Sequence, residues 1–308
     1  MLALKERLAF VAKLLTAEAP LAYLDYPVHE NVGDLLILLG TERFFADYRL
    51  RVRYRASAFN FRPPDFLRDP GAVVVCHGGG NFGDLYPTFH GFRESLVRRY
   101  PRNRIVVLPQ TLHFEDPVKL RESSAVFRAH RDLHLLVRDE PSCRLALEHF
   151  SDKVHLVPDM AHQLWPVASP PRAVDGSVRE LLLVRRDGEG GTLPEMIARR
   201  AEEFRDWRDL LGPADWRLLR AAVLAFRLDR RLGNALPVAW AWRRYAGALA
   251  RRAVALYAGY DRIVTSRLHG QILACLMARP SVLLDNSYGK NSSYHRAWLS
   301  TIPEARLG

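Results

Sequence analysis

The fold is decided by residues 72–84, which have the sequence AVVVCHGGGNFGD. The first five residues form a short, continuously apolar run, which is typical of a strand buried on both faces of a parallel sheet. Three glycines follow, and they let the backbone turn sharply and bring N–H groups close to a ligand. Asn81 and Asp84 add polar side chains at the same point. The segment predicts a buried strand that ends in a ligand-binding turn, without the spacing of a dinucleotide fingerprint.

The succession of strand, polar turn and helix recurs on both sides of this segment. Residues 21–24 form an apolar run before a turn at 29–34, and the stretch LLILLGTERFF (35–45) predicts a buried helix. Further strands are expected at 104–108, 133–137, 154–157, 180–184, 262–265 and 280–284, with helices at 89–100, 142–150 and 271–278. This alternation predicts an α/β fold with a parallel, doubly wound sheet, in which ligands bind beyond the carboxyl ends of the strands.

The length of 308 residues favours two lobes, because single cores stop growing at roughly 250–300 residues. Residues 167–179 are rich in Pro, Ser and Ala and suit a linker. We therefore expect an N-terminal Rossmann-like lobe at 1–166 and a C-terminal Rossmann-like lobe at 180–308. The second lobe would include mostly helical, arginine-rich sequence at 195–257.

The net charge of +11 comes from arginine and is compatible with a nucleic acid, an anionic membrane surface or an anionic substrate. Three cysteines stand far apart, without the spacing of a zinc site or a disulfide framework. The N-terminal segment is an amphipathic helix whose charges interrupt any signal-peptide core. We expect no metal and no cofactor, and a cytoplasmic protein, with contact at the inner face of the cytoplasmic membrane as one interpretation.

Arg267-Leu268-His269 is the sharpest chemical feature of the chain. It follows an apolar strand and begins a helix, whose N-terminal N–H groups favour an anion. Arginine there can bind a carboxylate or a phosphate through two parallel bonds, and histidine can transfer a proton near neutral pH. The alternative is a helix-capping histidine beside a surface arginine. Arg138-Asp139 stands at another strand end, where a local ion pair is the alternative.

Polar residues at the remaining strand ends are weaker candidates. Asn31 and Asp34 lie in the turn after the first strand, where capping of the next helix is the structural alternative. His113 comes just past a strand, and His90 lies early in a helix. Each of these two would more often be a satisfied surface or core histidine.

The helical region after residue 213 combines arginines with aromatic side chains. Its members are Arg217, Arg220, Arg227, Arg230, Arg231, Arg243, Arg244, Arg251 and Arg252, with Trp216, Phe226, Trp240 and Trp242. Such a segment can bind nucleic acid, dock at an anionic membrane surface or be a solvated helix face. Docking at the membrane is the functional hypothesis, in which the tryptophan rings lie at the level of the headgroups.

Seven short stretches in order resemble the polysaccharide pyruvyltransferase family, in particular its bacterial exopolysaccharide branch. They are DYP (25–27) with NVGD (31–34), HGGGNFGD (77–84), LPQTLHF (108–114), VRD (137–139), PDMA (158–161), TSRLHG (265–270) and LDNSYGK (284–290). The family motif has Asp where this chain has Ser266. The resemblance implies two Rossmann-like lobes, similar to the two-domain (GT-B-like) glycosyltransferases, with the site between them.

The resemblance also implies phosphoenolpyruvate as donor, a sugar of a growing, lipid-linked glycan as acceptor, and a cyclic pyruvate ketal as product. In that chemistry Arg267 and Arg138 would bind the anionic groups of the donor, and His269 would be the general acid. The other expected donor-side residues are Gly79, Gly80, Asn81, Leu268 and Asn31. The candidates on the acceptor side, which the sequence cannot rank, are Asp34, Asp84, His90 and His113.

Two other interpretations remain open at this stage. A nucleotide-sugar glycosyltransferase of the same fold would also use glycine turns and an arginine at a helix start, but no acidic ribose site is evident in the C-terminal half. A non-catalytic module that binds a glycan or RNA would not need His269. Under the favoured interpretation the partners are phosphoenolpyruvate and the glycan, with no nucleic acid.

Overall fold

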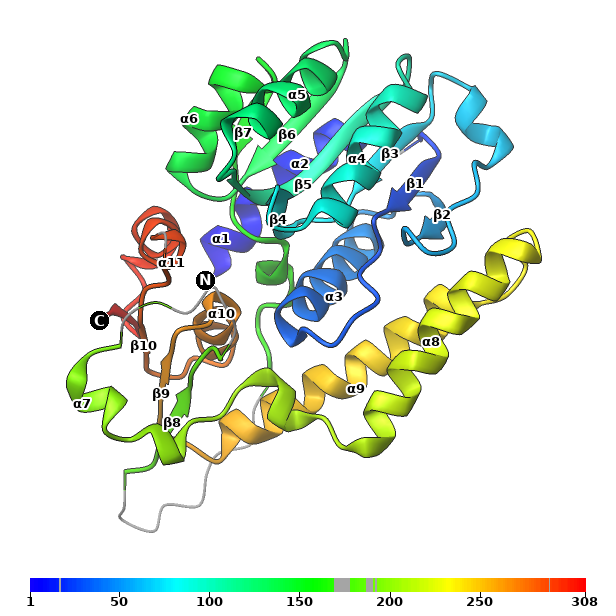
Figure 1. Ribbon diagram of the computed structural model, residues 1–308. Coiled ribbons are helices and arrows are strands. Elements are labelled where there is room, and N and C mark those ends of the chain that lie inside the picture. The colour runs from blue at the N-terminus through cyan, green and yellow to red at the C-terminus, as the bar shows by residue number, and fades with distance from the viewer. Residues whose placement is uncertain (17, 169–177, 187–190, 192, 288) are drawn as a thin grey trace.

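A computed structural model describes residues 1–16, 18–168, 178–186, 191, 193–287 and 289–308. Two parallel sheets lie one above the other in Figure 1, so the expected α/β architecture with two Rossmann-like lobes is confirmed. The strands of the first sheet are β1 (Leu21–Leu24), β2 (Val52–Ala56), β3 (Val73–Cys76), β4 (Gly79–Gly83), β5 (Arg104–His113), β6 (Leu133–Val137) and β7 (Val154–Leu156). Those of the second are β8 (Glu180–Leu183), β9 (Arg262–Thr265), β10 (Ser281–Leu283) and β11 (Ala305–Leu307).

The first sheet has the strand order β2-β1-β3-β5-β6-β7, and the second has the order β11-β10-β9-β8. All described strand pairs are parallel. The predicted boundaries of β1, β6 and β9 agree with the structure residue for residue. These strands are short apolar runs, and almost every residue in them is buried.

The predicted turn after β3 is wrong, because the glycine segment forms strand β4. β3 pairs only with Arg104–Val107 of β5, whereas β5 continues to His113. β4 pairs with Gln110, Leu112 and His113, so it takes over as the neighbour of β5 where β3 ends. A buried strand edge needs a hydrogen-bonding partner, and the extended glycine segment supplies it.

Helices cover both faces of the first sheet and enclose the second (Figure 1). The helices of the first lobe are α1 (Leu2–Arg7), α2 (Ala9–Leu15), α3 (Val32–Asp47), α4 (Pro87–Arg99), α5 (Pro117–Arg128) and α6 (Glu140–His149), with short 3-10 turns η1 (Asp65–Arg68) and η2 (Met160–Leu164). Then follow α7 (Glu195–Ala198), η3 (Ala201–Glu203), η4 (Trp207–Leu210), α8 (Pro213–Arg231), α9 (Val238–Ala258), α10 (Leu268–Leu276), α11 (Lys290–Tyr294) and the π-helical turn η5 (His295–Leu299). Within the described residues, no helix is both long and apolar enough to span a membrane.

Helix α3 lies between the two sheets and belongs to both hydrophobic cores. Leu35 and Leu38 pack with the first sheet, whereas Val32 and Leu36 pack with the core of the second. An α-helix that is apolar around its whole circumference has to be buried on all sides. The predicted buried helix is thus confirmed, and its N-terminus is held between the lobes. The expected linker at 167–179 falls mostly on 169–177, which lie outside the described residues.

A close backbone contact joins α3 to the segment that follows β7. A β-carbon at Gly40 would lie only 2.1 Å from the carbonyl oxygen of Met160. Only glycine allows this approach, because every other residue would push η2 away from α3. The contact therefore also sets the position of Asp159, which caps η2.

We expect Gly40→Ala to lower the free energy of unfolding by about 1–3 kcal/mol, the usual cost of overpacking. Gly91→Ala is the matched control, because Gly91 also lies in a helix but has no atom within 4 Å of the position that a β-carbon would take. That change should stabilise the protein by about 0.5–1 kcal/mol, since alanine is the better helix former. Urea denaturation measures both, and equal effects would contradict the role of Gly40.

Candidate active site

A cavity of about 280 Å³ opens between the lobes, beyond the carboxyl ends of the strands. Eight of the predicted site residues line it: Asn31, Asp34, Gly80, Asn81, Arg138, Arg267, Leu268 and His269. The other lining residues are His29, Glu30, Tyr86, Phe89, Arg185, Trp207, Arg208, Lys290 and Asn291. Gly79 is adjacent in β4 but does not line the cavity.

Asp159 joins residues of both lobes beneath the cavity. One of its oxygens, Oδ2, accepts a hydrogen bond from Arg138 Nη1 at 2.6 Å and lies 3.2 Å from His269 Nε2. The other, Oδ1, accepts from the backbone N–H of Ala161 at 2.9 Å. Burial alone would raise the pKa of Asp159, but the adjacent His269 and Arg138 hold it well below its usual range. Asp159 is therefore an ionised carboxylate shared by the two strongest sequence candidates.

Arg138 is fixed along most of its length, and one nitrogen is left to face the cavity. Its Nε donates to Thr111 Oγ1 at 2.9 Å, and its carbonyl accepts from Trp298 Nε1 at 2.8 Å. A β-carbon at Gly80 would lie 3.0 Å from Arg138 Nη2 and 2.7 Å from Lys290 Nζ. The glycine thus leaves space in front of two cationic groups.

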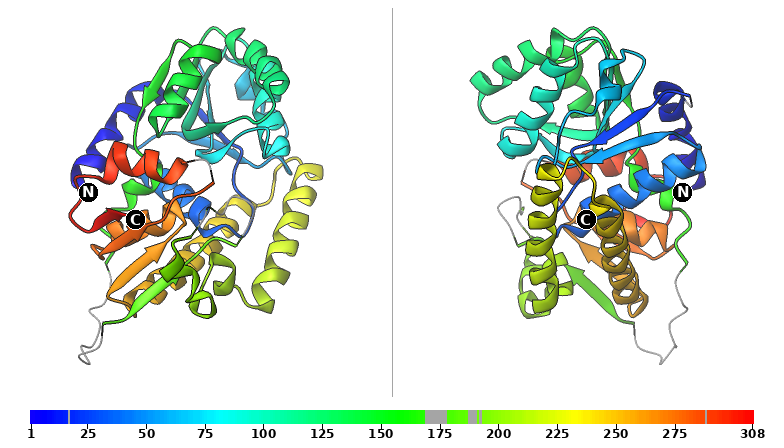
Figure 2. Two further views of the ribbon diagram at one scale, coloured as in Figure 1. Left: turned by 60° about the vertical axis from the view of Figure 1, so that its left-hand side comes forward. Right: turned by 90° about the vertical axis from the view of Figure 1, so that its right-hand side faces the viewer.

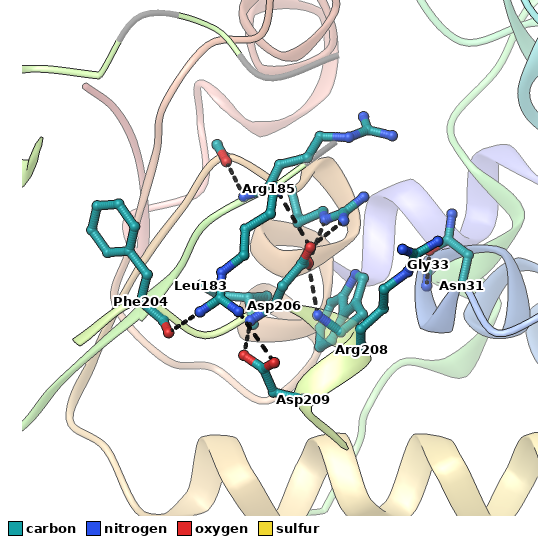
Figure 3. Close-up of polar contacts among 12 residues, drawn as sticks. Asn31, Gly33, Leu183, Arg185, Phe204, Asp206, Arg208 and Asp209 are labelled. Carbon is teal, nitrogen blue, oxygen red and sulfur yellow. Dashed lines mark hydrogen bonds and ion pairs between the residues drawn. The ribbon is translucent and has the colours of Figure 1, made fainter. Parts of the chain in front are cut away.

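Arg267 is buried and pairs with Asp206, a residue whose polar contacts are drawn in Figure 3. Its Nε and Nη2 donate to the two carboxylate oxygens at 2.8 and 2.6 Å. Asp206 also accepts from the backbone N–H of Trp207 at 2.7 Å, and its own N–H donates to Asp209 at 2.8 Å. This bidentate pair fixes the plane of the guanidinium at the cavity wall. The alternative of a surface arginine is wrong.

His269 lies in the first turn of α10, whose N-cap is Arg267. With Nε2 directed at Asp159, its Nδ1 faces Gly33 at the start of α3, where a β-carbon would lie 2.8 Å away. The backbone N–H groups of this helix end favour an anion in the cavity. A histidine next to an anion site can donate a proton to a bound molecule.

The turn before α3 adds a carboxylate to the opposite wall. The cap of α3 is Asn31, which accepts from the N–H of Gly33 at 3.0 Å and donates to Asp34 Oδ2 at 2.9 Å. Asp34 lies 3.6 Å from His29 Nε2 and retains about a fifth of its side-chain exposure. The capping role considered for Asp34 thus falls to Asn31.

A fully buried ion pair between Arg93 and Asp25 holds Asn81 in position. Arg93 pairs with Asp25 at 2.5 Å, donates to the carbonyl of Asn81 at 2.9 Å and also contacts its side-chain oxygen. Burial raises the pKa of Asp25 to about 6, although the adjacent arginine opposes the shift. Asp25 also has a left-handed backbone conformation with φ of 59°. These contacts hold the amide of Asn81 at the cavity edge.

Three acceptor-side candidates lie away from this cavity. Asp84 accepts the backbone N–H groups of Glu115 and Asp116 and so anchors a loop. His90 is buried, with Nε2 2.6 Å from Ser123 Oγ. Both line a separate cavity of about 900 Å³ beside α4 and α5. His113 ends β5 near Glu115. Of the four candidates, the structure brings only Asp34 together with His269.

Sequence reasoning missed several residues of the site. Asp159, Arg185 and Lys290 follow strands or strand-end loops, so the rule of polar carboxyl ends could have indicated them. Asp206 caps the short 3-10 turn η4 and Arg208 lies within that turn, so neither stands at a predicted strand end and neither gave a comparable signal. The local ion pair considered for Arg138 and Asp139 does not form, since Asp139 caps α6 and accepts from Thr111.

Cationic side chains outnumber carboxylates in the lining of the cavity, and two of them, Arg138 and Arg267, pair with Asp159 and Asp206 behind that lining. Five cationic side chains line the cavity, against the two carboxylates of Glu30 and Asp34; they are Arg138, Arg185, Arg208, Arg267 and Lys290. Arg208 pairs with Glu30 at 3.0 Å. Among the described residues, no group of three or more His, Cys, Asp or Glu side chains could hold a metal ion. The arrangement suits a compact, multiply charged anion.

Asp159→Asn should lower the free energy of unfolding by about 3–5 kcal/mol, because it leaves the buried charge of Arg138 uncompensated. The folded-state pKa of Asp159 is depressed, so its stabilising effect is present above the unfolded pKa of about 3.9 and is lost as the pH falls below it. The wild type should therefore lose stability below about pH 4, and the variant should lose less. Chemical denaturation between about pH 2.5 and 7 measures this.

The control for this experiment is Asp139→Asn. Asp139 is equally buried, but it accepts only neutral donors, from Thr111 and the backbone of Ser142. Its replacement should cost less stability, because asparagine caps a helix about as well as aspartate. If both variants had the same stability and pH profile, Asp159 would not carry the charge balance described above.

Several known proteins are similar to this chain over most of its length. Residues 31–288 match the family of polysaccharide pyruvyl transferases. EpsO of Bacillus subtilis (strain 168) is 38% identical over 308 residues, which cover 100% of this chain and 94% of that protein. Pyruvyl transferase 1 of Schizosaccharomyces pombe (strain 972) is 30% identical over 296 residues, which cover 90% of this chain and 69% of that protein.

The fold is also similar to a solved crystal structure. That protein comes from Klebsiella pneumoniae subsp. pneumoniae NTUH-K2044, and it superposes with a TM-score of 0.67 at 18% identity. The superposition covers 100% of this chain and 99% of the other, so the likeness extends to both lobes. On the match over residues 31–288 and the full-length similarity to its relatives, the chain belongs to the polysaccharide pyruvyl transferase family.

Proposed function

We propose that the protein transfers the pyruvyl group of phosphoenolpyruvate to a sugar of a lipid-linked glycan, as a cyclic ketal, in exopolysaccharide biosynthesis. The observation that carries this proposal is the set of five cationic side chains around a cavity that also holds His269 and Asp34. Phosphoenolpyruvate carries a carboxylate and a phosphate on three carbons, so a small cavity with several cations matches it. No cofactor takes part in the proposed reaction.

The donor would lie with its anionic groups on two cationic walls. Arg138 and Lys290 stand together in front of Gly80 on one wall. Arg267, held by Asp206, lies on the other with Arg185 and Arg208. Arginine suits planar carboxylates and phosphates, because its fork of N–H groups makes parallel hydrogen bonds. The N-terminus of α10 would add backbone N–H groups to the same anion.

In the proposed reaction His269 protonates the methylene carbon of the donor. The double bond opens and carbon 2 becomes electrophilic, so a sugar hydroxyl adds to it as it loses its proton to a base. Phosphate then leaves with the C–O bonding electrons. A second hydroxyl of the same sugar adds at carbon 2 as it loses its proton to the now neutral His269, and this addition closes the ketal. Asp159 would stabilise the protonated histidine before transfer, and the cationic walls would stabilise the departing phosphate.

Asp34 is the proposed base for the acceptor hydroxyl. It lines the same cavity as His269, and His29 lies 3.6 Å from its carboxylate. A carboxylate that is partly exposed can accept a proton from a hydroxyl at the cavity mouth and pass it to water. Asn31 fixes its orientation through a hydrogen bond of 2.9 Å.

A nucleotide-sugar glycosyltransferase is the second candidate for this fold. Sites for drug-sized ligands occupy about 300–1,000 Å³, and a nucleotide diphosphate sugar needs the upper part of that range. The cavity of about 280 Å³ favours the smaller donor. Phosphate release that requires a nucleotide sugar rather than phosphoenolpyruvate would overturn the proposal.

His269→Ala is expected to reduce turnover by about 10²–10⁴-fold, the usual effect of losing an acid–base group. The affinity for phosphoenolpyruvate should change much less, because the cationic walls remain. Phosphate release in the presence of a glycan acceptor measures turnover, and calorimetry with phosphoenolpyruvate alone measures affinity. A variant that keeps near-normal turnover would assign the acid to another residue.

Asp206→Ala should weaken binding of phosphoenolpyruvate by at least tenfold, because Arg267 loses the partner that orients it. The control is Asp209→Ala, which removes a capping carboxylate of the same turn but no contact of Arg267. In an Arg267→Ala background the change at Asp206 should have little further effect on affinity. Additive losses in the double variant would show that Asp206 acts independently of Arg267.

A further inference from the structure

Helices α8 and α9 form a long antiparallel pair at the edge of the molecule (Figure 2). One face of the pair packs on α3 and the first sheet through Leu219, Phe226 and Trp242. Asp229 accepts from Asn60 at 2.8 Å and ties the end of α8 to the loop after β2. The opposite face has no partner within the described part of the chain.

This outer face carries a row of large apolar side chains. Its large side chains are between 37% and 63% exposed: Leu218, Leu224, Leu228, Leu232, Leu236 and Trp240. An apolar groove of about 260 Å³ runs between the two helices and is floored by alanines and by Trp242. Leu218, Leu228 and Leu232 recur at helical spacing beside Ala221 and Ala225, so α8 has a second apolar stripe in addition to its buried one. A water-exposed stripe of this kind indicates an interaction surface.

Arginines flank the stripe, and exposed carboxylates are missing from it. Residues 213–258 contain only two acids, Asp215 and Asp229, and both are buried. Three of the nine arginines contact a different element of the fold, since Arg243 pairs with Glu42, Arg252 pairs with Asp215, and Arg227 lies over the ring of Phe59. The rest are Arg217, Arg220, Arg230, Arg231, Arg244 and Arg251, all of them exposed.

The combination of exposed leucines and exposed arginines indicates which kind of partner fits this face. A second copy of the chain would bring the same positive charges against each other, so self-association through this face is disfavoured. Nucleic acid would be matched by the arginines but not by the five exposed leucines on α8 and the loop that follows it. An anionic bilayer surface matches both, because leucines enter the acyl boundary while arginines contact the headgroups. The tryptophans differ from expectation: Trp240 is exposed, whereas Trp242 is buried.

We propose that the outer face of the α8–α9 pair, through its exposed leucines and arginines, docks the protein on an anionic phospholipid bilayer. The use of this surface, to meet a lipid-linked acceptor, rests on the proposed function. The surface itself can be tested without any substrate. Arg243 and Arg252 are not suitable test positions, because their replacement would break ion pairs with Glu42 and Asp215.

The test is co-sedimentation of the full chain with phosphatidylcholine vesicles that contain either no phosphatidylglycerol or about 30% of it. Each basic residue near such a surface contributes about 1 kcal/mol, so Arg220, Arg230 and Arg231→Gln together should weaken binding roughly 10²-fold. Leu224→Ser together with Leu228→Ser should also weaken binding. Added salt should weaken binding of the wild type, because it screens the charges. The matched control replaces Arg102, Arg121 and Arg144, which are equally exposed on the first lobe, with Gln.

Binding that is lost in the two test variants and kept in the control supports the proposal. Equal binding to neutral and anionic vesicles, or an equal loss in the control, would overturn it. So would light scattering that shows a dimer in the wild type and a monomer in the leucine variant, since a second copy would then occupy the face. If the protein does not bind vesicles but still transfers pyruvate to a soluble acceptor, the docking proposal is refuted and the proposed function stands.

Discussion

One buried carboxylate, that of Asp159, joins a side chain from each lobe of the molecule. Arg138 follows β6 in the first sheet, and His269 begins α10 beside the second. Leaving the buried charge of Arg138 or of Asp159 without its counterion is costly, and His269 meets the same oxygen from the other lobe, so this carboxylate fixes how the two lobes are arranged. The position of Asp159 in turn depends on how closely η2 approaches Gly40 of α3. The packing of η2 against α3 therefore also determines the geometry of the site.

The side chain of Arg267 is oriented by a protein partner before it binds a ligand. Its guanidinium makes a bidentate pair with Asp206. Asp206 is the N-cap of η4, where a capping box with Asp209 and the N–H of Trp207 hold it in place. The bidentate pair lowers the entropy that the side chain of Arg267 would lose on meeting an anion, because its plane is already set. The same holds for Asn81, which rests on the buried pair of Arg93 and Asp25. The cavity is therefore largely organised before any ligand enters it.

The sequence predicts the elements whose pattern is local. Buried parallel strands such as β1, β6 and β9 are apolar runs between polar ends, and their boundaries can be recognised without tertiary information. β4 cannot be recognised in this way, because glycines carry no hydrophobic pattern and the strand forms only where β5 extends beyond β3. In the site, Arg138, Arg267 and His269 were found from their strand ends. The pairing of Arg267 with Asp206 and of His269 with Asp159 could not be predicted, since partners 61 and 110 residues apart leave no mark on spacing, although Asp159 itself follows a strand end.

Helix α9 has a consequence for how the lobes can move. Trp242, Ala246 and Leu249 in its first half pack in the core of the first sheet, whereas Ala253 and Tyr257 in its second half pack in the core of the other. A hinge needs a joint that few contacts cross, but here one rigid helix crosses it, alongside α3. Relative motion of the sheets is therefore restricted to small sliding steps between close-packed side chains, that is, to shear. Exchange of substrate and product would then depend on rotamer changes at the rim of the cavity, and its rate would be set by side chains rather than by the swing of a whole lobe.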